Sequence, residues 1–270
     1  MNALILVGGQ SRRMGRDKAL IARPDGSRQI DHIAALASGL CDGVFLSVRE
    51  NVPTGISLPV IPDLRPGEGP VAALESAAAR GGPWLVLGCD LFLMDRETLA
   101  FLSDHRDPSR MATCFRNRID GRAEPLCAIY EPAGLAHAAA ALSEGRRCAR
   151  EFLESLDPLL LDLPRPAALD NANTPDELAE CFAKLTAGSV PKSVRLLYFA
   201  KLREARGLDG ETVETLACTV AGLYEELRFR HRLPLESAML RAAINGEFAD
   251  WHASVSEGDE IVFIPPVAGG

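Results

Sequence analysis

The chain has 270 residues, of which 47% are hydrophobic and 24% charged, and its formal net charge is −8. This composition is typical of a globular protein, and the acidic balance argues against nucleic acid as a partner. Because the seven cysteines form no C-x-x-C pair, we expect reduced thiols and a cytoplasmic location. We expect no membrane partner, since no apolar run approaches the ~20 residues needed to span a bilayer.

The first predicted element is a buried strand over the apolar residues 4–7. Gly8 and Gly9 follow it, and without a Cβ they let the backbone approach a ligand closely. Backbone N–H groups, Arg12, Arg13 and Lys18 give this loop a positive potential that suits a polyphosphate. The glycine spacing fits neither the P-loop nor the dinucleotide-binding fingerprint.

The next elements alternate between helix and strand. Apolar spacing predicts a helix over 30–40, strands over 44–48 and 58–61, a helix that begins at Pro70, and a strand over 84–90. The last of these strands is almost continuously apolar, which is typical of a strand covered on both faces. The sequence therefore predicts a layered α/β fold with a mainly parallel sheet.

Two aspartates each follow a predicted strand. Asp63 comes after the third strand and Asp90 after the fourth. Because ligands bind at the carboxyl ends of strands in open α/β sheets, we expect both aspartates and the glycine loop to share one edge. A carboxylate there can hold Mg²⁺, which bridges triphosphate oxygens. A helix cap is the structural alternative for Asp90.

A capping box is predicted before the last helix of this region. Thr174 suits the N-cap, Pro175 the first helical position, and Glu177 the reciprocal partner of the cap. The cap does not explain Asn171 and Asn173, which remain candidates for ligand binding.

After a linker of small residues at 187–192, a second set of predicted strands and helices begins. We predict strands and a helix in the order strand, strand, helix, strand, strand, over residues 193–200, 211–214, 219–230, 240–245 and 260–264. Thr219 suits the N-cap of this helix. This arrangement is a compact α+β unit. The expected domains are therefore 1–186 and 193–270.

The carboxy-terminal tail is extended by two prolines and ends in two glycines. Pro265 and Pro266 stop the strand, and Gly269 and Gly270 carry no side chains before the free carboxylate. Such a tail can thread a narrow tunnel in another protein. A disordered terminus is the ordinary alternative.

The pattern Gly-Gly-x-Ser-x-Arg-Met-Gly-x-Asp-Lys over 8–18 resembles the signature of nucleoside triphosphate transferases, and most of all the molybdenum cofactor guanylyltransferase family. Further elements match this family: Asp63 before Gly69-Pro70, the Cys89-Asp90 pair, Gly145-Arg146-Arg147, and the N-x-N-T-P element over 171–175. The resemblance implies a Rossmann-like nucleotidyltransferase domain over residues 1–186.

The resemblance also implies roles for individual residues. The domain would use Mg²⁺ and transfer GMP from GTP to molybdopterin, with Asp90 as the metal ligand and Arg12, Lys18 and Asp90 as catalytic residues. Arg147, Asn171 and Asn173 would face the pterin. The implied nucleotide-binding residues are Leu6, Val7, Gly8, Gly9, Ser11, Arg12, Lys18, Ser47, Asp63 and Asp90.

Some positions depart from the family pattern. Ser47 stands where guanylyltransferases often have asparagine, Leu91-Phe92 replaces the usual Thr-Pro, Ala73 replaces a glycine, and Glu124-Pro125-Leu126 replaces His-Pro-Thr. A cytidylyltransferase of the same cofactor and a sugar-phosphate nucleotidyltransferase therefore stay open. A third alternative also stays open, in which the first domain has lost its activity and serves only as a scaffold for the last third of the chain.

Residues 193–270 are similar to the small subunit of molybdopterin synthase, a ubiquitin-like sulfur carrier with a β-grasp fold. The similarity lies in 197–204, 243–246, 258–260 and the tail. It implies that an activating enzyme adenylates Gly270, that sulfur converts it to a thiocarboxylate, and that the large synthase subunit uses this sulfur. Both resemblances belong to one biosynthetic pathway.

Overall fold

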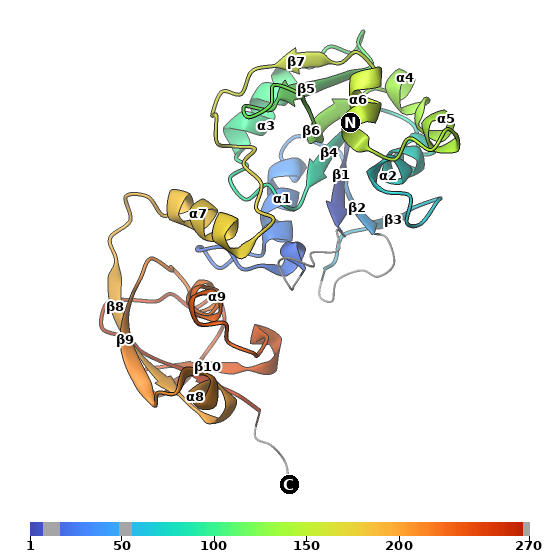
Figure 1. The fold of residues 1–270 in the computed structure, drawn as a ribbon. Coiled ribbons are helices and arrows are strands. Elements are labelled where there is room, and N and C mark those ends of the chain that lie inside the picture. Colours follow the sequence, from blue (N-terminus) through green and yellow to red (C-terminus); the bar gives the residue numbers. More distant parts are fainter. Residues whose placement is uncertain (8–16, 49–55, 267–270) are drawn as a thin grey trace. The chain divides into compact units, whose positions relative to one another are not determined.

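A computed structural model describes residues 1–7, 17–48 and 56–266 (Figure 1). The chain divides into two compact units: residues 1–20 with 29–178, and residues 21–28 with 179–270. The domain bounds 1–186 and 193–270 stay predictions.

The first unit is built on a seven-stranded sheet with the order β3-β2-β1-β4-β6-β5-β7. Only β6 among these strands runs against its neighbours, so the sheet is mainly parallel, as predicted. The strands are β1 (Asn2–Val7), β2 (Val44–Val48), β3 (Val60–Pro62), β4 (Trp84–Gly88), β5 (Ala112–Arg116), β6 (Ala123–Tyr130) and β7 (Leu159–Leu161).

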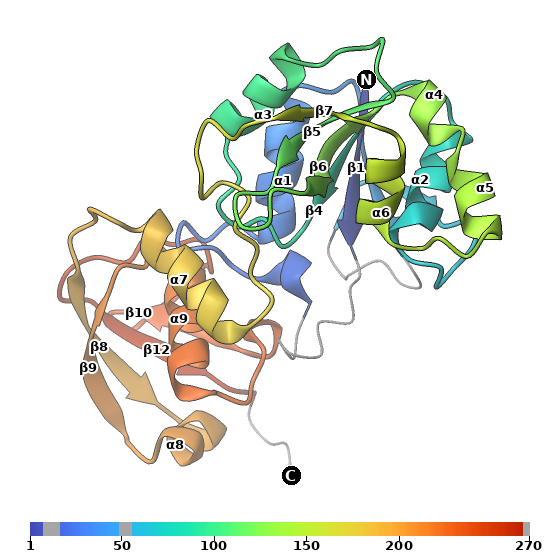
Figure 2. The same cartoon turned by 45° about the horizontal axis from the view of Figure 1, so that its top comes forward.

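Helices cover both faces of this sheet, as Figures 1 and 2 show. Alternate residues of a central strand point to opposite faces, so Ile5 packs in the core with the helix residue Ile33, and Leu4 packs in the core with Leu74. This is why β1 and β4 read as continuous apolar runs. One face carries α1 (Gln29–Ser38) and α3 (Arg96–Asp104); the other carries α2 (Pro70–Ala78), α4 (Pro132–Leu135), α5 (Ala138–Ser143) and α6 (Ala149–Ser155).

The antiparallel strand β6 contains a proline, Pro125. Pro125 has no N–H to donate, and the pairing of β6 with β5 shifts its register between Cys114 and Arg116, opposite this part of the strand. The irregular pairing accommodates the proline without losing the strand. The chain between the two strands forms a hairpin tip over residues 117–122.

The second unit has a five-stranded sheet of order β11-β10-β12-β8-β9, in which β12 and β8 run parallel. α9 (Val220–His231) packs in one core with the sheet, where the rings of Tyr224 and Phe263 lie 4.6 Å apart. This is the predicted β-grasp arrangement. The remaining elements are β8 (Lys192–Tyr198), α8 (Ala200–Arg206), β9 (Gly210–Thr215), η2 (Ser237–Met239), β10 (Arg241–Ile244), β11 (Glu247–Ala249) and β12 (Glu260–Ile264).

Two predicted helix caps are confirmed. Glu177 N–H donates to the Thr174 hydroxyl at 3.3 Å, and Thr174 N–H donates to the Glu177 carboxylate at 3.1 Å, at the start of α7 (Pro175–Leu185). The Thr219 hydroxyl accepts from Gly222 N–H at the start of α9. The short elements α8 and β11 were not predicted, because each is brief and α8 buries one residue, Leu202.

The close packing of α4 against residue 111 yields a stability prediction. A Cβ at Gly134 would lie 2.3 Å from the Met111 carbonyl oxygen, whereas a Cβ at Gly39 would meet its nearest atom at an ordinary 3.5 Å. We expect Gly134→Ala to lower the free energy of unfolding by about 2–4 kcal/mol, since backbone must shift. Gly39→Ala should change it by less than about 0.5 kcal/mol. Urea titrations of the two variants check this, and equal effects would contradict it.

Candidate functional site

Three predicted site residues from distant parts of the chain meet at one point. Lys18 Nζ donates to Asn173 Oδ1 at 2.7 Å and lies 3.7 Å from Asp90 Oδ2. The Lys18 side chain is 15% exposed and that of Asp90 is 22% exposed. The ammonium group is therefore held, largely out of solvent, between a carboxylate and an amide oxygen.

The local sequence around β4 places Asp90. β4 ends at Gly88, and a Cβ on Gly88 would lie 2.7 Å from Asp90 Oδ1, so the glycine leaves the space that this carboxylate occupies. The Asp90 carbonyl accepts from the Ala172 N–H at 3.1 Å. Ala172 itself is fully buried. This backbone hydrogen bond connects the N-x-N-T-P element, residues 171–175, to the turn that follows β4.

A second pair of predicted residues lies at the ends of β2 and β3. The buried Ser47 hydroxyl donates to Asp63 Oδ1 at 2.8 Å. Leu6 of β1 is in register with Ser47 on one side and with Gly88 on the other. The sheet therefore brings Leu6, Ser47 and the start of the Asp90 turn to the same edge, as the strand-end argument predicts.

The structure describes some of the remaining predicted site residues and not others. Arg147 is largely exposed, and its guanidinium lies 3.4 Å from Glu68, next to the Gly69-Pro70 turn. Asn171 is exposed and Val7 is buried. The predictions for Gly8, Gly9, Ser11, Arg12, Gly269 and Gly270 fall outside the described residues.

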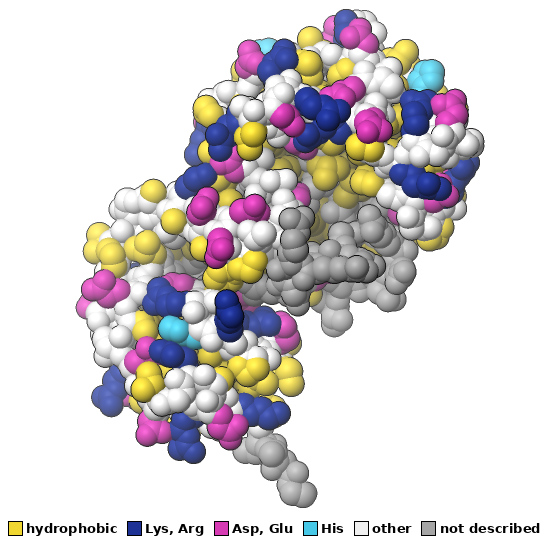
Figure 3. All heavy atoms as spheres, in the orientation of Figure 1, with side chains coloured by type: hydrophobic (Ala, Val, Ile, Leu, Met, Phe, Trp, Pro, Cys, Tyr) yellow, Lys and Arg dark blue, Asp and Glu magenta, His cyan; other side chains and the backbone are white. Residues whose placement is uncertain are grey.

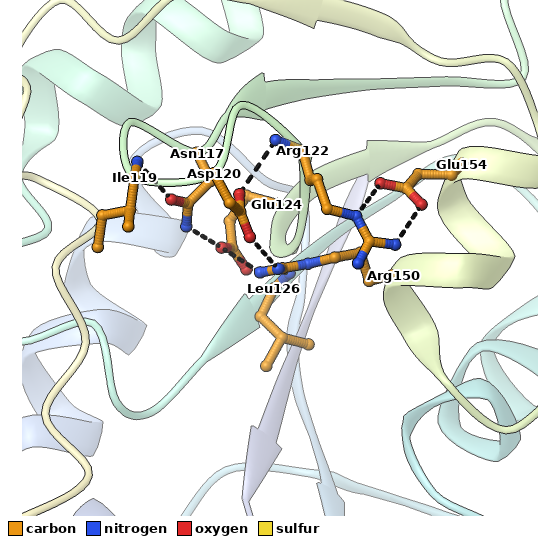
Figure 4. Close-up of polar contacts among 8 residues, drawn as sticks. All are labelled: Asn117, Ile119, Asp120, Arg122, Glu124, Leu126, Arg150 and Glu154. Atoms are coloured by element: carbon orange, nitrogen blue, oxygen red, sulfur yellow. Dashed lines mark hydrogen bonds and ion pairs between the residues drawn. The ribbon is translucent and has the colours of Figure 1, made fainter.

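A buried carboxylate beside the site was not predicted as functional. Leu87 of β4 pairs with Cys127 of antiparallel β6, so the start of β6 lies near the turn that follows β4, and the charge of Asp90 acts on Glu124. Glu124 is 8% exposed and accepts from the Leu126 N–H and from Asn117, both at 3.3 Å (Figure 4). Its carboxylate also lies 3.6 Å from Arg150. In the sequence, Glu124 stood out only because Glu124-Pro125-Leu126 replaces the His-Pro-Thr of the family pattern.

Burial raises the pKa of the Glu124 carboxyl, and the negative charge of Asp90 raises it further. The Leu126 N–H, Asn117 and Arg150 lower the same pKa without cancelling the effect of burial. Burial is the largest of these causes, and the charge of Asp90 adds to it in the same direction.

Several charged side chains elsewhere on the described surface form ion pairs. On the visible face of the first unit, basic and acidic side chains lie interspersed (Figure 3), and the ion pairs include Arg122–Glu154 and Arg150–Asp120. Within the described residues, no group of three or more His, Cys, Asp or Glu side chains is arranged to hold a metal ion. In the same part of the chain, no helix is long and apolar enough to cross a membrane.

Comparison with known proteins identifies the family. Residues 3–159 match the MobA-like NTP transferase domain, which covers more than half of the chain, and residues 196–270 match the ThiS family. The chain belongs to the MobA-like NTP transferase family. The two matches confirm both resemblances that the sequence motifs carry.

The relatives of this family member agree with the assignment. A probable molybdenum cofactor guanylyltransferase from Mycobacterium ulcerans is 31% identical over 183 residues, which cover 65% of this chain and 90% of the relative. A molybdenum cofactor biosynthesis bifunctional protein from Synechocystis is 31% identical over 182 residues, or 66% of this chain. This chain spans 52% of that longer relative.

Solved structures support the fold of the first unit. Molybdopterin-guanine dinucleotide biosynthesis protein A from Archaeoglobus fulgidus is similar with a TM-score of 0.59 and 23% identity, over 69% of this chain and 99% of that chain. A nucleotidyl transferase from Methanothermobacter thermautotrophicus has a TM-score of 0.54 and 17% identity, over 68% of this chain and 98% of that chain. Both likenesses confirm the α/β fold.

The raised pKa of Glu124 gives a prediction on stability and pH. A raised folded-state pKa means that this group's stabilisation is complete below its ordinary pKa of 4.5 and is lost as pH rises through the folded value. Glu124→Gln stays neutral, so the variant should gain stability over the wild type near pH 7 and lose that advantage near about pH 4. Thermal unfolding without nucleotide or magnesium measures this. A pH-independent difference would contradict it.

Proposed function

We propose that this chain is a bifunctional molybdenum cofactor biosynthesis protein. Its first unit transfers GMP from GTP to the terminal phosphate of molybdopterin and releases pyrophosphate. The observation that carries this proposal is the meeting of Lys18, Asp90 and Asn173. Lys18 is the last residue of the phosphate-binding motif, Asp90 lies two residues after a central strand, and Asn173 belongs to the N-x-N-T-P element, so we infer that two substrate subsites adjoin at one carboxylate.

Asp90 suits a magnesium ion bound together with the nucleotide. Mg²⁺ keeps most of its waters and is commonly held by one or two carboxylates plus substrate phosphates, so the single half-buried carboxylate at Asp90 fits it. When bound, the ion would neutralise charge on the triphosphate. Ser47 and Asp63 would line the nucleotide side of the same edge.

The protein's task in this reaction is positioning and charge neutralisation. The molybdopterin phosphate attacks the α-phosphorus in line, a new P–O bond forms, and the bond to pyrophosphate breaks with its electron pair. Leu6–Gly9 and Ser11 would hold the nucleotide, and Arg12 and Lys18 would offset phosphate charge. Arg147, Asn171 and Asn173 would hold the pterin substrate.

Removing either charged group at the meeting point tests this assignment. We expect Lys18→Ala and Asp90→Ala each to lower turnover with Mg-GTP and molybdopterin by at least about 100-fold, because each removes charge stabilisation at the reacting phosphates. Pyrophosphate release measures turnover. Matched controls are Lys201→Ala and Asp104→Ala, which remove exposed charges on α8 and α3. Near-normal turnover in either site variant, with an unchanged melting temperature, would refute the assignment.

Base choice separates this proposal from the other transferases. A thermal-shift panel with Mg-GTP, Mg-CTP and Mg-UTP should give the largest stabilisation with GTP. Stabilisation by CTP alone would favour a cytidylyltransferase of the same cofactor, and by UTP a sugar-phosphate enzyme. No stabilisation by any nucleotide would favour a scaffold.

For the second unit we propose a sulfur carrier. The support is its β-grasp sheet, the ThiS-family match that extends to residue 270, and the terminal Gly269-Gly270. An activating enzyme would adenylate the terminal carboxylate, and the large subunit of molybdopterin synthase would accept its sulfur. With such partners, and with reduced cysteines, we propose that the protein acts in the cytoplasm.

Deleting Gly269-Gly270 should separate the two activities. The truncated chain should lose thiocarboxylate formation with an activating enzyme, ATP and a sulfur donor, while nucleotide transfer stays within about twofold, because the tail is remote in sequence from the site. Mass spectrometry of the intact chain follows the exchange of oxygen for sulfur. A truncated chain that still supports molybdopterin synthesis would refute the carrier role.

A further inference from the structure

The segment that carries the two asparagines is fastened at several points. Ala168 and Leu169 are buried, the Ala172 N–H donates to the Asp90 carbonyl, and Asn173 accepts from Lys18. At its start, Arg165 pairs with Asp95, the N-cap of α3. The asparagine segment, residues 165–173, is thus held along the edge of the sheet where the site lies.

One further contact reaches this segment from the tip of the β5–β6 hairpin. Arg118 donates from Nε to Asp170 Oδ1 at 2.8 Å and from Nη2 to Asp170 Oδ2 at 2.9 Å. The Asp170 side chain is 15% exposed, while that of Arg118 is 47% exposed. A two-pronged arginine–carboxylate pair fixes orientation as well as distance. Asp170, the acidic partner of this pair, immediately precedes Asn171 in the chain.

The hairpin tip is itself held by side chains at its base (Figure 4). Arg122 forms two hydrogen bonds with Glu154 of α6, at 2.9 and 2.6 Å, and Asp120 pairs with Arg150 of α6 at 2.7 Å. Asn117 donates to the buried Glu124. The tip is therefore a fixed support rather than a loose turn, and Arg118 extends it to the asparagine segment.

We propose that Arg118 is a positioning residue for the acceptor substrate, which through Asp170 sets the place of Asn171 and Asn173 at the site. This inference rests on the proposed function, because it takes the asparagines as the acceptor side. The hairpin already has its own attachments to α6, so it does not need the Asp170 pair to stay folded. Because the Arg118 side chain is about half exposed, we expect the pair to contribute little to the free energy of unfolding. Its main effect is then on the position of the asparagine segment.

The kinetic test uses four variants of the full chain. These are Arg118→Ala, Asp170→Ala, the double alanine variant, and the reversed pair Arg118→Asp with Asp170→Arg. We expect each single variant to raise KM for molybdopterin about fivefold, with KM for GTP and kcat within about twofold. The double variant should be no worse than the singles, and the reversed pair should regain part of the loss.

A matched control removes another arginine–aspartate pair, whose arginine precedes β5 whereas Arg118 follows it. Arg110 pairs with Asp157 at 3.0 Å, and both side chains are exposed, so Arg110→Ala should leave both KM values unchanged. Equal rises in KM for GTP and for molybdopterin in Arg118→Ala would overturn the proposal. So would additive losses in the double variant.

Hydrogen exchange gives a readout that does not depend on the reaction. In Arg118→Ala, amides of residues 165–173, including Ala172, should exchange faster than in the wild type, while the strands keep their protection. Unchanged exchange there would overturn the positioning role. If the wild type transfers no nucleotide, the proposed function fails and with it the acceptor role, whereas exchange still decides whether Arg118 holds the segment.

Discussion

The site depends on the placement of one ammonium group. Lys18 lies between the Asp90 carboxylate and the Asn173 amide oxygen, and it has little exposure to solvent. A largely buried charge is costly unless it is paired and hydrogen-bonded, so the fold must bring both partners to it. Three segments far apart in sequence are therefore held at one point.

The sheet supplies most of that convergence. Parallel strands β1, β2 and β4 end at the same edge, which brings the residues after each strand together. The antiparallel strand β6 begins at this edge and adds Glu124 beside Asp90. Two acidic side chains, Asp90 and Glu124, therefore lie near each other at this edge of the sheet. The asparagine segment, residues 165–173, lies against this edge. It contacts the Asp90 carbonyl through Ala172, Lys18 through Asn173, and Arg118 through Asp170.

The sequence predicted the parts of this arrangement that local rules govern. The apolar runs of β1 and β4, the caps at Thr174 and Thr219, and the strand-end position of Asp90 follow from periodicity and from which groups need partners. Both family resemblances were also readable, since they lie in short contiguous motifs.

Other features depend on packing that no local pattern reveals. The partners Arg118 and Asp170 are 52 positions apart in sequence, and nothing in either neighbourhood marks them as a pair. Glu124 is distinguished by burial and by the charge of Asp90, and both arise only when β6 pairs with β4. The short helix α8 buries only Leu202, so it has no amphipathic signal.

Nucleotide transfer to purified molybdopterin, with α-phosphate-labelled GTP, CTP and UTP supplied separately, tests the central claim most directly. The account predicts label on molybdopterin from GTP, dependent on Mg²⁺ and accompanied by an equal amount of pyrophosphate. No transfer from any nucleotide, or transfer only to a sugar phosphate, would contradict it.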